Sequence, residues 1–299
     1  MTTSPYGDLA RPPLSEKSLN RLLVRPGSLW HDITVVPETG STNADLATAA
    51  KAGVAEGAVL VAEEQLAGRG RLGRTWAAPP RSGLMFSVLL RADVDPQRLG
   101  WLPLLTGVAV ASAVRRMTAR ARDGDFGEPT GEVAVDARLK WPNDVLVGDR
   151  KLAGILTERV GTPAGSAVVV GVGLNVSLRA DELPVPTATS LALEHAAFTD
   201  REPLLRAILR ELDRRYAAWR DVGGDPDATG PGGDAGGLRR AYEELCATLG
   251  RSVHVQVPGG RVVDGTAHGI DATGRLVVRT GDGDEAINAG DVVHVRSGT

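Results

Sequence analysis

Residues 68–76 read GRGRLGRTW, so that three glycines and three arginines interleave before a tryptophan. Glycine lets a backbone approach a ligand closely, and the planar guanidinium of arginine binds phosphate or carboxylate through two parallel hydrogen bonds. The run also contains G-x-G-x-x-G, but a dinucleotide-binding turn requires a helix directly after the glycines. Pro79 and Pro80 follow instead and disfavour a helix. The pattern predicts an anion-binding loop, with a solvated basic loop as the structural alternative.

The composition limits the class of protein. A chain of 299 residues can form one large domain, or one large and one small domain. The net charge of −3 gives no electrostatic reason to bind nucleic acid or an anionic membrane. The single cysteine, Cys246, excludes an internal disulfide and is interpreted as a core residue of a helix. The sequence contains neither a signal-peptide pattern nor 18 consecutive apolar residues, so we expect a cytoplasmic protein.

The hydrophobic pattern predicts an α+β domain over residues 29–249, after an N-terminal extension over residues 1–28. The expected helices cover residues 15–24, 44–52, 102–117, 201–220 and 238–249. The expected strands cover residues 33–36, 59–63, 84–90, 139–141, 145–147, 151–160 and 167–176. Residues 121–132 are expected to form a mobile insertion, and the Gly/Pro/Asp-rich residues 223–237 to be disordered.

The pattern changes near the C-terminus. From Ser252 onward, short alternating strands are separated by glycine-containing turns. Five short strands within about fifty residues are typical of a small β-barrel. We therefore predict a second, all-β domain over residues 250–299.

Four further segments place polar residues or glycines where packing residues would be expected. They are GSTN at 40–43, Gln65 at the end of a strand, KWPND at 140–144 followed by KLAG at 151–154, and GVGLNV at 171–176. Each has a structural alternative: a helix N-cap at residues 41–42, a surface position for Gln65, a solvated strand end for Lys151, and a bulge at the strand glycines.

Together with the loop, these segments resemble the biotin–protein ligases. The motifs of that family are a Ser-Thr-Asn turn, GRGRxGRxW, KWPND, KLAGIL and GxGxN, and all five occur here in that order between Ile33 and the C-terminus. The resemblance implies a mixed β-sheet catalytic domain with flanking helices, similar to class II synthetases, and a small C-terminal SH3-like β-barrel. Many bacterial members add an N-terminal winged-helix domain that makes them repressors. Since about 30 residues precede the first expected strand, we expect an enzyme without DNA-binding function.

The resemblance also implies site residues, each at the position that matches a family motif. The implied biotin site is Ser41, Thr42, Asn43, Gln65, Gly68, Arg69, Gly70, Arg71, Lys151, Gly154 and Gly173. The implied ATP or AMP site is Arg74, Trp76, Asn143, Lys151 and Asn175. The expected catalytic residues are Arg69, Arg71 and Lys151, whose positive charges would offset the repulsion between two anions, and Asp144. Asp144 is expected either to accept the proton of an incoming lysine or to bind metal or nucleotide. The resemblance assigns no metal ligands.

The implied activity is ATP-dependent and has two steps. Biotin is activated as biotinyl-5′-AMP, with Mg²⁺ neutralising the triphosphate, and is then transferred to a lysine of a biotin carboxyl carrier domain of an acyl-CoA carboxylase. We expect residues 68–76 to be mobile without ligand and to close over the adenylate, because ordering glycine-rich backbone is costly. A monomer or weak homodimer is expected, with neither nucleic acid nor membrane as partner. The lipoyl or octanoyl transferases, which share the general fold, and a repressor are the rival interpretations.

Overall fold

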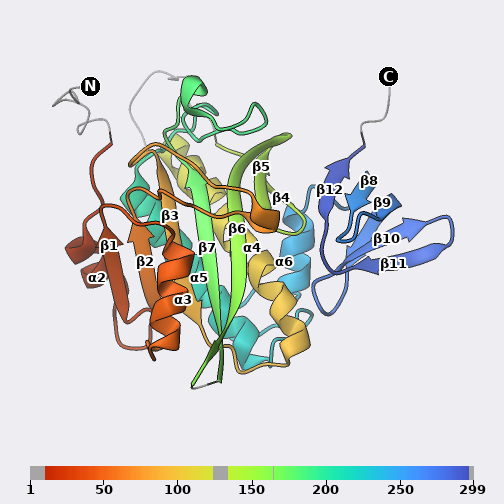
Figure 1. Cartoon of the computed structure of the whole chain (residues 1–299), viewed down its shortest axis with the longest axis horizontal. Helices are drawn as coiled ribbons and strands as arrows, with labels where there is room; N and C mark the ends of the chain where they lie inside the picture. The colour runs from red at the N-terminus through yellow and green to blue at the C-terminus, as the bar shows by residue number, and fades with distance from the viewer. Residues whose placement is uncertain (1–10, 124–133, 164, 296–299) are drawn as a thin grey trace.

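The computed structural model describes residues 11–123, 134–163 and 165–295. These residues form two sheets, one of seven strands in the order β1-β2-β3-β7-β6-β5-β4 and one of five strands in the order β11-β10-β9-β8-β12 (Figure 1). The strands of the first sheet are β1 (Asp32–Val36), β2 (Ala58–Ala62), β3 (Gly83–Leu90), β4 (Ala137–Lys140), β5 (Asp144–Val147), β6 (Arg150–Thr162) and β7 (Gly165–Asn175). β1 and β2 are parallel and the other neighbours are antiparallel, which confirms the expected mixed sheet.

Helices cover both faces of this sheet. The α-helices are α2 (Glu16–Leu23), α3 (Thr42–Lys51), α4 (Trp101–Asp123), α5 (Arg201–Asp221) and α6 (Gly237–Leu245). Short 3₁₀ helices occupy Arg71–Gly73, Pro96–Gly100 and Ala180–Glu182. α3 packs on β3, β6 and β7, whereas α4 and α5 pack on each other behind the sheet (Figure 1). Within the described part of the chain, no helix is both long and apolar enough to cross a bilayer.

The side chains of β7 pack on both faces of the first sheet. Val168, Val170 and Val172 belong to the main core, together with residues of α4 and α5. Val169, on the other face, belongs to a smaller cluster with Leu46 of α3. Since side chains alternate along a strand, the residues that continue the α3 face beyond Val169 are Gly171, Gly173 and Asn175. Along β7, the face that contacts α3 therefore changes from an apolar side chain, Val169, to two glycines and the amide of Asn175.

The second sheet forms the C-terminal domain. Its strands are β8 (Ser252–Gln256), β9 (Val262–Ile270), β10 (Leu276–Thr280), β11 (Gly283–Ile287) and β12 (Asp291–His294). All neighbouring strands are antiparallel. Among the described residues, the pairing runs from β11 to β12 and does not join these two edge strands. The five expected strands are present, but closure into an SH3-like barrel is not confirmed.

Two indoles attach the C-terminal domain to the first domain. The Nε1 of Trp101 donates to the carbonyl of Ala272 at 3.1 Å, and the Nε1 of Trp141 donates to the carbonyl of Gly274 at 3.0 Å. Gly274, at φ +85°, lies so close to Gly100 that a Cβ there would be 2.8 Å from the Gly100 carbonyl. Glycine is required at this contact by conformation and by space.

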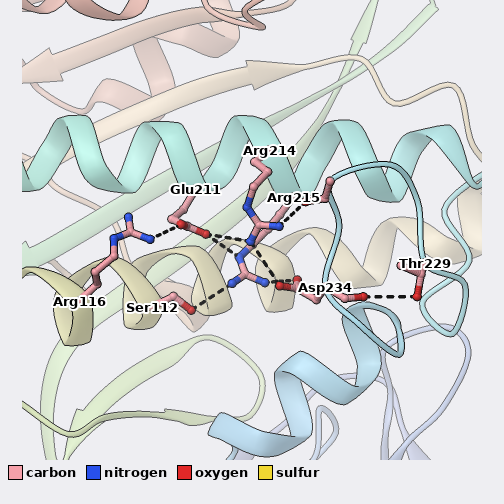
Figure 2. Close-up of polar contacts among 8 residues, drawn as sticks. Ser112, Arg116, Glu211, Arg214, Arg215, Thr229 and Asp234 are labelled. Atoms are coloured by element: carbon pink, nitrogen blue, oxygen red, sulfur yellow. Dashed lines mark hydrogen bonds and ion pairs between the residues drawn. The ribbon is translucent and has the colours of Figure 1, made fainter.

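Residues 223–237, which were expected to be disordered, have defined contacts. Gly230 packs so closely on Ala218 of α5 that a Cβ would lie 2.0 Å from its carbonyl oxygen. Figure 2 shows Arg214 and Arg215 of α5 directed toward Asp234, and both form ion pairs with it. These long-range contacts oppose a composition that favours disorder, and the mobility of the segment stays a prediction.

Two helices end at residues other than the expected ones. α6 ends at Leu245, so Cys246 is not part of a helix; it is half-buried and forms a parallel bridge with Leu139 of β4. Residues 121–123 of the expected mobile insertion belong to α4, and its remaining residues, 124–132, lie outside the described part of the chain.

Candidate active site

The N-terminus of α3 is capped by a residue distant in sequence. The Oε1 of Gln65 accepts hydrogen bonds from the backbone N–H of Thr42 at 2.8 Å and from its hydroxyl at 3.1 Å. Gln65 reaches this position because it pairs with Thr39 just beyond β2. Ser41 is the N-cap residue by position but makes no capping bond with its side chain. Gln65 therefore performs the capping that the sequence suggested for residues 41–42, and the buried Ser41 hydroxyl is left for other contacts.

Asn43 is held against the sheet by three hydrogen bonds. Its Oδ1 accepts from the Ser87 hydroxyl at 2.6 Å, and its Nδ2 donates to the Glu158 carboxylate at 2.7 Å and to the Leu156 carbonyl at 3.3 Å. Gly171 makes room for it, since a Cβ there would lie 2.1 Å from Asn43 Oδ1. Both amide protons are engaged by protein acceptors. Asn43 therefore fixes α3 on the sheet, and Gly171 is needed for this contact although it was not among the predicted site residues.

The glycine–arginine loop has an internal hydrogen-bonded structure. The N–H of Gly70 donates to the carbonyl of Arg74 at 2.7 Å, and the N–H of Trp76 donates to the carbonyl of Gly68 at 2.8 Å. Leu72 and Gly73 have φ values of 55° and 73°, which reverse the chain. Extended backbone follows in place of a helix. The loop is therefore not a Rossmann turn.

The indole of Trp76 lies over two strand glycines. A Cβ on Gly173 of β7 would be 2.3 Å from Trp76 Cε2, and one on Gly154 of β6 would be 3.2 Å from Trp76 Cζ3. The ammonium of Lys151 is 5.8 Å from the centroid of the ring, within the range of a cation–π contact. These glycines therefore serve a close approach of the aromatic side chain, which distinguishes them from a simple bulge.

Charged groups converge beside Trp76. The Nζ of Lys151 lies 2.6 Å from Oδ1 of Asp144. The Nη1 of Arg71 donates to Oδ1 of Asn143 at 3.0 Å, and Asn143 in turn donates to the carbonyl of Ile155 at 2.9 Å. Burial lowers the pKa of Arg71, while the nearby Asp144 carboxylate opposes this shift. The geometry places two cations and one carboxylate beside one aromatic ring.

The remaining predicted residues lie at the ends of the same site. Arg74 forms an ion pair with Asp291 of β12, and its side chain is 61% exposed. The hydrogen bond to Asp291 raises the pKa of Arg74. Asn175 is buried and donates to the carbonyl of Thr189 at 2.9 Å. Arg74 thus links the loop to the C-terminal domain, and the amide of Asn175 is in contact with the protein backbone.

One cavity of about 1560 Å³ collects nearly all of these residues. The predicted residues that line it are Ser41, Thr42, Asn43, Gln65, Arg69, Gly70, Arg71, Arg74, Trp76, Asn143, Asp144, Lys151, Gly154, Gly173 and Asn175. Gly68 does not line it, but it closes the base of the loop, where a Cβ would be 2.3 Å from the Trp76 carbonyl oxygen. The cavity continues to Lys140, Arg251 and His294, which the sequence analysis did not assign. For Lys140 the KWPND motif was an available signal, whereas nothing in the sequence pointed to Arg251.

Comparisons with known proteins show the family to which the chain is similar. A model of the "Biotin/lipoate A/B protein ligase family" matches residues 36–175, and a model of the "Biotin protein ligase C terminal domain" matches residues 248–295. A biotin--[acetyl-CoA-carboxylase] ligase of Mycobacterium tuberculosis is 43% identical over 291 residues, which are 97% of this chain and 98% of that protein. The chain belongs to the biotin protein ligase family.

Two further relatives extend the comparison. The bifunctional ligase/repressor BirA of Escherichia coli is 30% identical over 82% of this chain and 68% of its own length. The biotin protein ligase from Aquifex aeolicus, solved in complex with biotin and ATP, has a TM-score of 0.67 and 27% identity over 90% of this chain and all of that one. These matches confirm the expected family and its fold.

Proposed function

We propose that this chain is an ATP-dependent biotin–protein ligase. The observation that carries the proposal is the single cavity in which hydroxyl and amide groups, an aromatic ring and a cluster of cations lie together. A carboxylate oxygen of biotin attacks the α-phosphorus of ATP, and the bond from that phosphorus to the bridging oxygen breaks to release pyrophosphate. A lysine amine of a carrier domain then attacks the acyl carbon and releases AMP.

The end of the cavity near α3 suits an uncharged ring. Gln65 uses its carbonyl oxygen to cap α3, so its amide N–H groups are the donors left for a ligand. Ser41 and Thr42 lie beside it and line the cavity. Biotin carries a neutral ureido ring with one carbonyl acceptor and two N–H donors, which matches such groups. The ring is therefore assigned to this end.

The cations beside Trp76 suit the activation step. A carboxylate and a phosphate repel each other, and the charge on the phosphate oxygens must be stabilised as the new bond forms. Arg71 and Lys151 converge on this region, and Arg69 lines the same cavity. Trp76 offers a flat surface for adenine. We assign the α-phosphate to the space between Arg71 and Lys151.

Mg²⁺ belongs to the proposal as a companion of ATP. Among the residues that the structure describes, no group of three or more His, Cys, Asp or Glu side chains is placed to hold a metal ion. Mg²⁺ commonly keeps several water ligands and binds through substrate phosphates with one or two carboxylates. Asp144 is the carboxylate nearest to Lys151 and is able to contribute a ligand.

The acceptor and the compartment are also proposals. The name of the Mycobacterium tuberculosis relative specifies an acetyl-CoA carboxylase, and we propose the biotin carboxyl carrier domain of such an enzyme as acceptor. We further propose that the enzyme works in the cytoplasm as a monomer or weak homodimer. The aligned part of E. coli BirA is 68% of that protein. We propose that this chain has the ligase activity but not the repressor activity.

The test is biotin-dependent exchange of labelled pyrophosphate into ATP, followed by transfer to a carrier domain. We expect exchange with biotin but not with lipoate, and biotin on the carrier when the domain is added. Lys151→Gln is the matched loss-of-charge variant, since it keeps a polar side chain but removes the charge, and it should abolish exchange. Exchange that depends on lipoate would overturn the proposal in favour of the lipoyl transferases.

A further inference from the structure

A chain of polar side chains connects Asn43 with Thr42 through Ser87 of β3. The hydroxyl oxygen of the buried Ser87 lies 2.6 Å from Oδ1 of Asn43 and 2.8 Å from the hydroxyl oxygen of Thr42. In the described part of the chain, Thr42 lines the cavity and Ser87 does not. The direction of each hydrogen bond in this chain decides what the Thr42 hydroxyl can offer to a ligand.

The orientation of the Asn43 amide is fixed by the groups on its other side. Its nitrogen lies 2.7 Å from the Glu158 carboxylate and 3.3 Å from the carbonyl oxygen of Leu156. A carbonyl oxygen can only accept a hydrogen bond, so the amide nitrogen, which carries the protons, must face this pair. The amide oxygen of Asn43 therefore faces Ser87 and requires a donor there.

The single proton of Ser87 decides the next hydrogen bond. A hydroxyl carries one proton, and the Asn43 oxygen uses it because that oxygen can only accept. The contact of 2.8 Å between Ser87 and Thr42 is then a hydrogen bond in which Thr42 donates. This length is typical of an O–H···O bond, whereas the same Thr42 hydroxyl lies 3.1 Å from Oε1 of Gln65. Ser87 is therefore the main acceptor of the Thr42 proton.

The Thr42 hydroxyl is left with lone pairs alone for a ligand. Within the residues that the structure describes, its oxygen contacts Ser87 and Gln65, and it is the donor in both contacts. It can therefore accept a hydrogen bond from a ligand but has no second proton to give. Gln65 has the opposite character, since its amide oxygen caps α3 and its N–H groups remain for a ligand. The α3 end of the cavity thus combines one acceptor with one donor.

We propose that Ser87 is a positioning residue: by taking the proton of Thr42, it makes this hydroxyl accept from a ring N–H and so selects the ureido ring. The inference rests on the proposed function, which assigns that ring to the α3 end of the cavity. A ring with oxygen or sulfur in place of the N–H, such as the dithiolane of lipoate, brings a lone pair against the lone pairs of Thr42. A site built to bind an N–H discriminates strongly against such a ligand, because its buried polar groups are left unpaired.

The test compares biotin with two analogues, in each of which oxygen replaces one of the two ring N–H groups to give a cyclic carbamate. Isothermal titration measures the three dissociation constants. For the unaltered protein, we expect one analogue to bind about 100-fold or more weakly than biotin. In Ser87→Ala the Thr42 proton loses its main acceptor and can turn to the ring oxygen. The ratio of the dissociation constants of that analogue and biotin should therefore fall by about tenfold.

Two further variants make the comparison specific. Ser112→Ala is the matched control, because Ser112 lies on α4 behind the sheet and accepts from Arg215 at 3.2 Å (Figure 2). It should leave the three constants unchanged. Ser87→Cys keeps the approximate size of the side chain but has a weaker donor and acceptor, so its ratio should be intermediate. Ser87→Cys decides the question if Ser87→Ala does not fold.

The ratio separates positioning from a purely structural role. Equal weakening of biotin and the analogue in the Ser87 variants, with an unchanged ratio, would assign Ser87 a structural role and overturn the inference. Binding of both analogues to the unaltered protein as tightly as biotin would also overturn it. Absence of biotin binding by the unaltered protein would instead refute the proposed function.

Discussion

At the scale of single residues, the geometry favours a specific role for Asp144. Its carboxylate contacts Lys151 at 2.6 Å and lies beside the proposed adenylate. An acceptor lysine with an ordinary pKa is only about one-thousandth deprotonated near pH 7.4, so the transfer step needs a group that takes its proton. A carboxylate in this position is suited to that role.

We expect Asp144→Asn to spare adenylate formation and to slow transfer to the carrier by about 100-fold or more, the usual scale for a lost general base. Pyrophosphate exchange measures the first step, and single-turnover transfer from preformed adenylate measures the second. Asp136→Asn, at an aspartate whose side chain is 60% exposed and pairs with Arg115, serves as control. Equal loss of both steps would assign Asp144 to metal or nucleotide binding instead.

The sequence predicted many of the residues that line the cavity, but not the contacts that each one makes. The motifs brought Asn43 and Gln65 into the biotin list, and both line the cavity. Their hydrogen bonds to Ser87, Glu158 and Thr42 depend on strands that are distant in sequence, so no local pattern could indicate them. Gly171 was part of a recognised motif, yet its contact with Asn43 becomes apparent only when α3 is packed on β7.

At the scale of elements, the loop of residues 68–76 contacts the sheet through Trp76, whereas its arginines make few contacts with the rest of the protein. Within the described residues, the side-chain contacts of its arginines are the hydrogen bond of Arg71 to Asn143 and the ion pair of Arg74 with Asp291. A glycine-rich segment held in this way loses conformational entropy when it closes over a ligand. Its mobility in the free protein remains a prediction.

Arg71→Gly should therefore weaken retention of the adenylate, because the substitution removes the guanidinium and adds backbone freedom. We expect faster release of biotinyl-5′-AMP and biotin on lysines of unrelated proteins. Both can be measured by filter binding and by blotting of a bystander protein such as serum albumin. Arg261→Gly is the control for a lost surface charge. Retention equal to that of the unaltered protein would contradict the closing-loop hypothesis.

A second element explains how the free edge of the first sheet is covered. Asn20 of α2 accepts from the N–H of Ile33 at 3.2 Å and donates to its carbonyl at 2.6 Å, as a neighbouring strand would. Glu16 accepts from the N–H of Val35 at 2.8 Å. An uncovered edge strand is a template for pairing with another chain. α2 therefore satisfies the edge of β1 with side chains.

Asn20→Ala should leave both polar groups of Ile33 without these partners and lower the free energy of unfolding by about 1–3 kcal/mol. Urea denaturation measures the loss, and sedimentation velocity detects any self-association through the exposed edge. Arg21→Ala, on the same helix, is the control. An unchanged denaturation midpoint would show that solvent replaces Asn20 without cost.

At the scale of the whole molecule, the two domains were predictable but their contact was not. The change in hydrophobic pattern placed the boundary near Ser252, and the second sheet starts there. The hydrogen bonds of Trp101 and Trp141 to carbonyls of residues 272 and 274 join segments more than 130 residues apart. No periodicity in the sequence carries information over such a distance. The contacts of residues 223–237 with α5 were not predictable for the same reason.

His294 makes this domain contact sensitive to pH. Its pKa in the folded protein is about 4, below the ordinary value of 6.5, with burial as the main cause. Between these two values the unfolded chain binds a proton that the folded protein does not. The contribution of neutral His294 to the free energy of unfolding is therefore complete above about pH 6.5 and is lost as the pH falls toward 4.

We expect the urea midpoint of the unaltered protein to fall between pH 7 and pH 5 more steeply than that of His294→Gln, which cannot take up this proton. Lys140, Arg251, Asp149 and Thr248 face the ring, so Lys140→Gln should raise the pKa of His294 and reduce the same slope. His254→Gln, an exposed histidine of the same domain, is the control. Identical slopes in the unaltered protein and His294→Gln would mean that the C-terminal domain stays in place when this ring is charged.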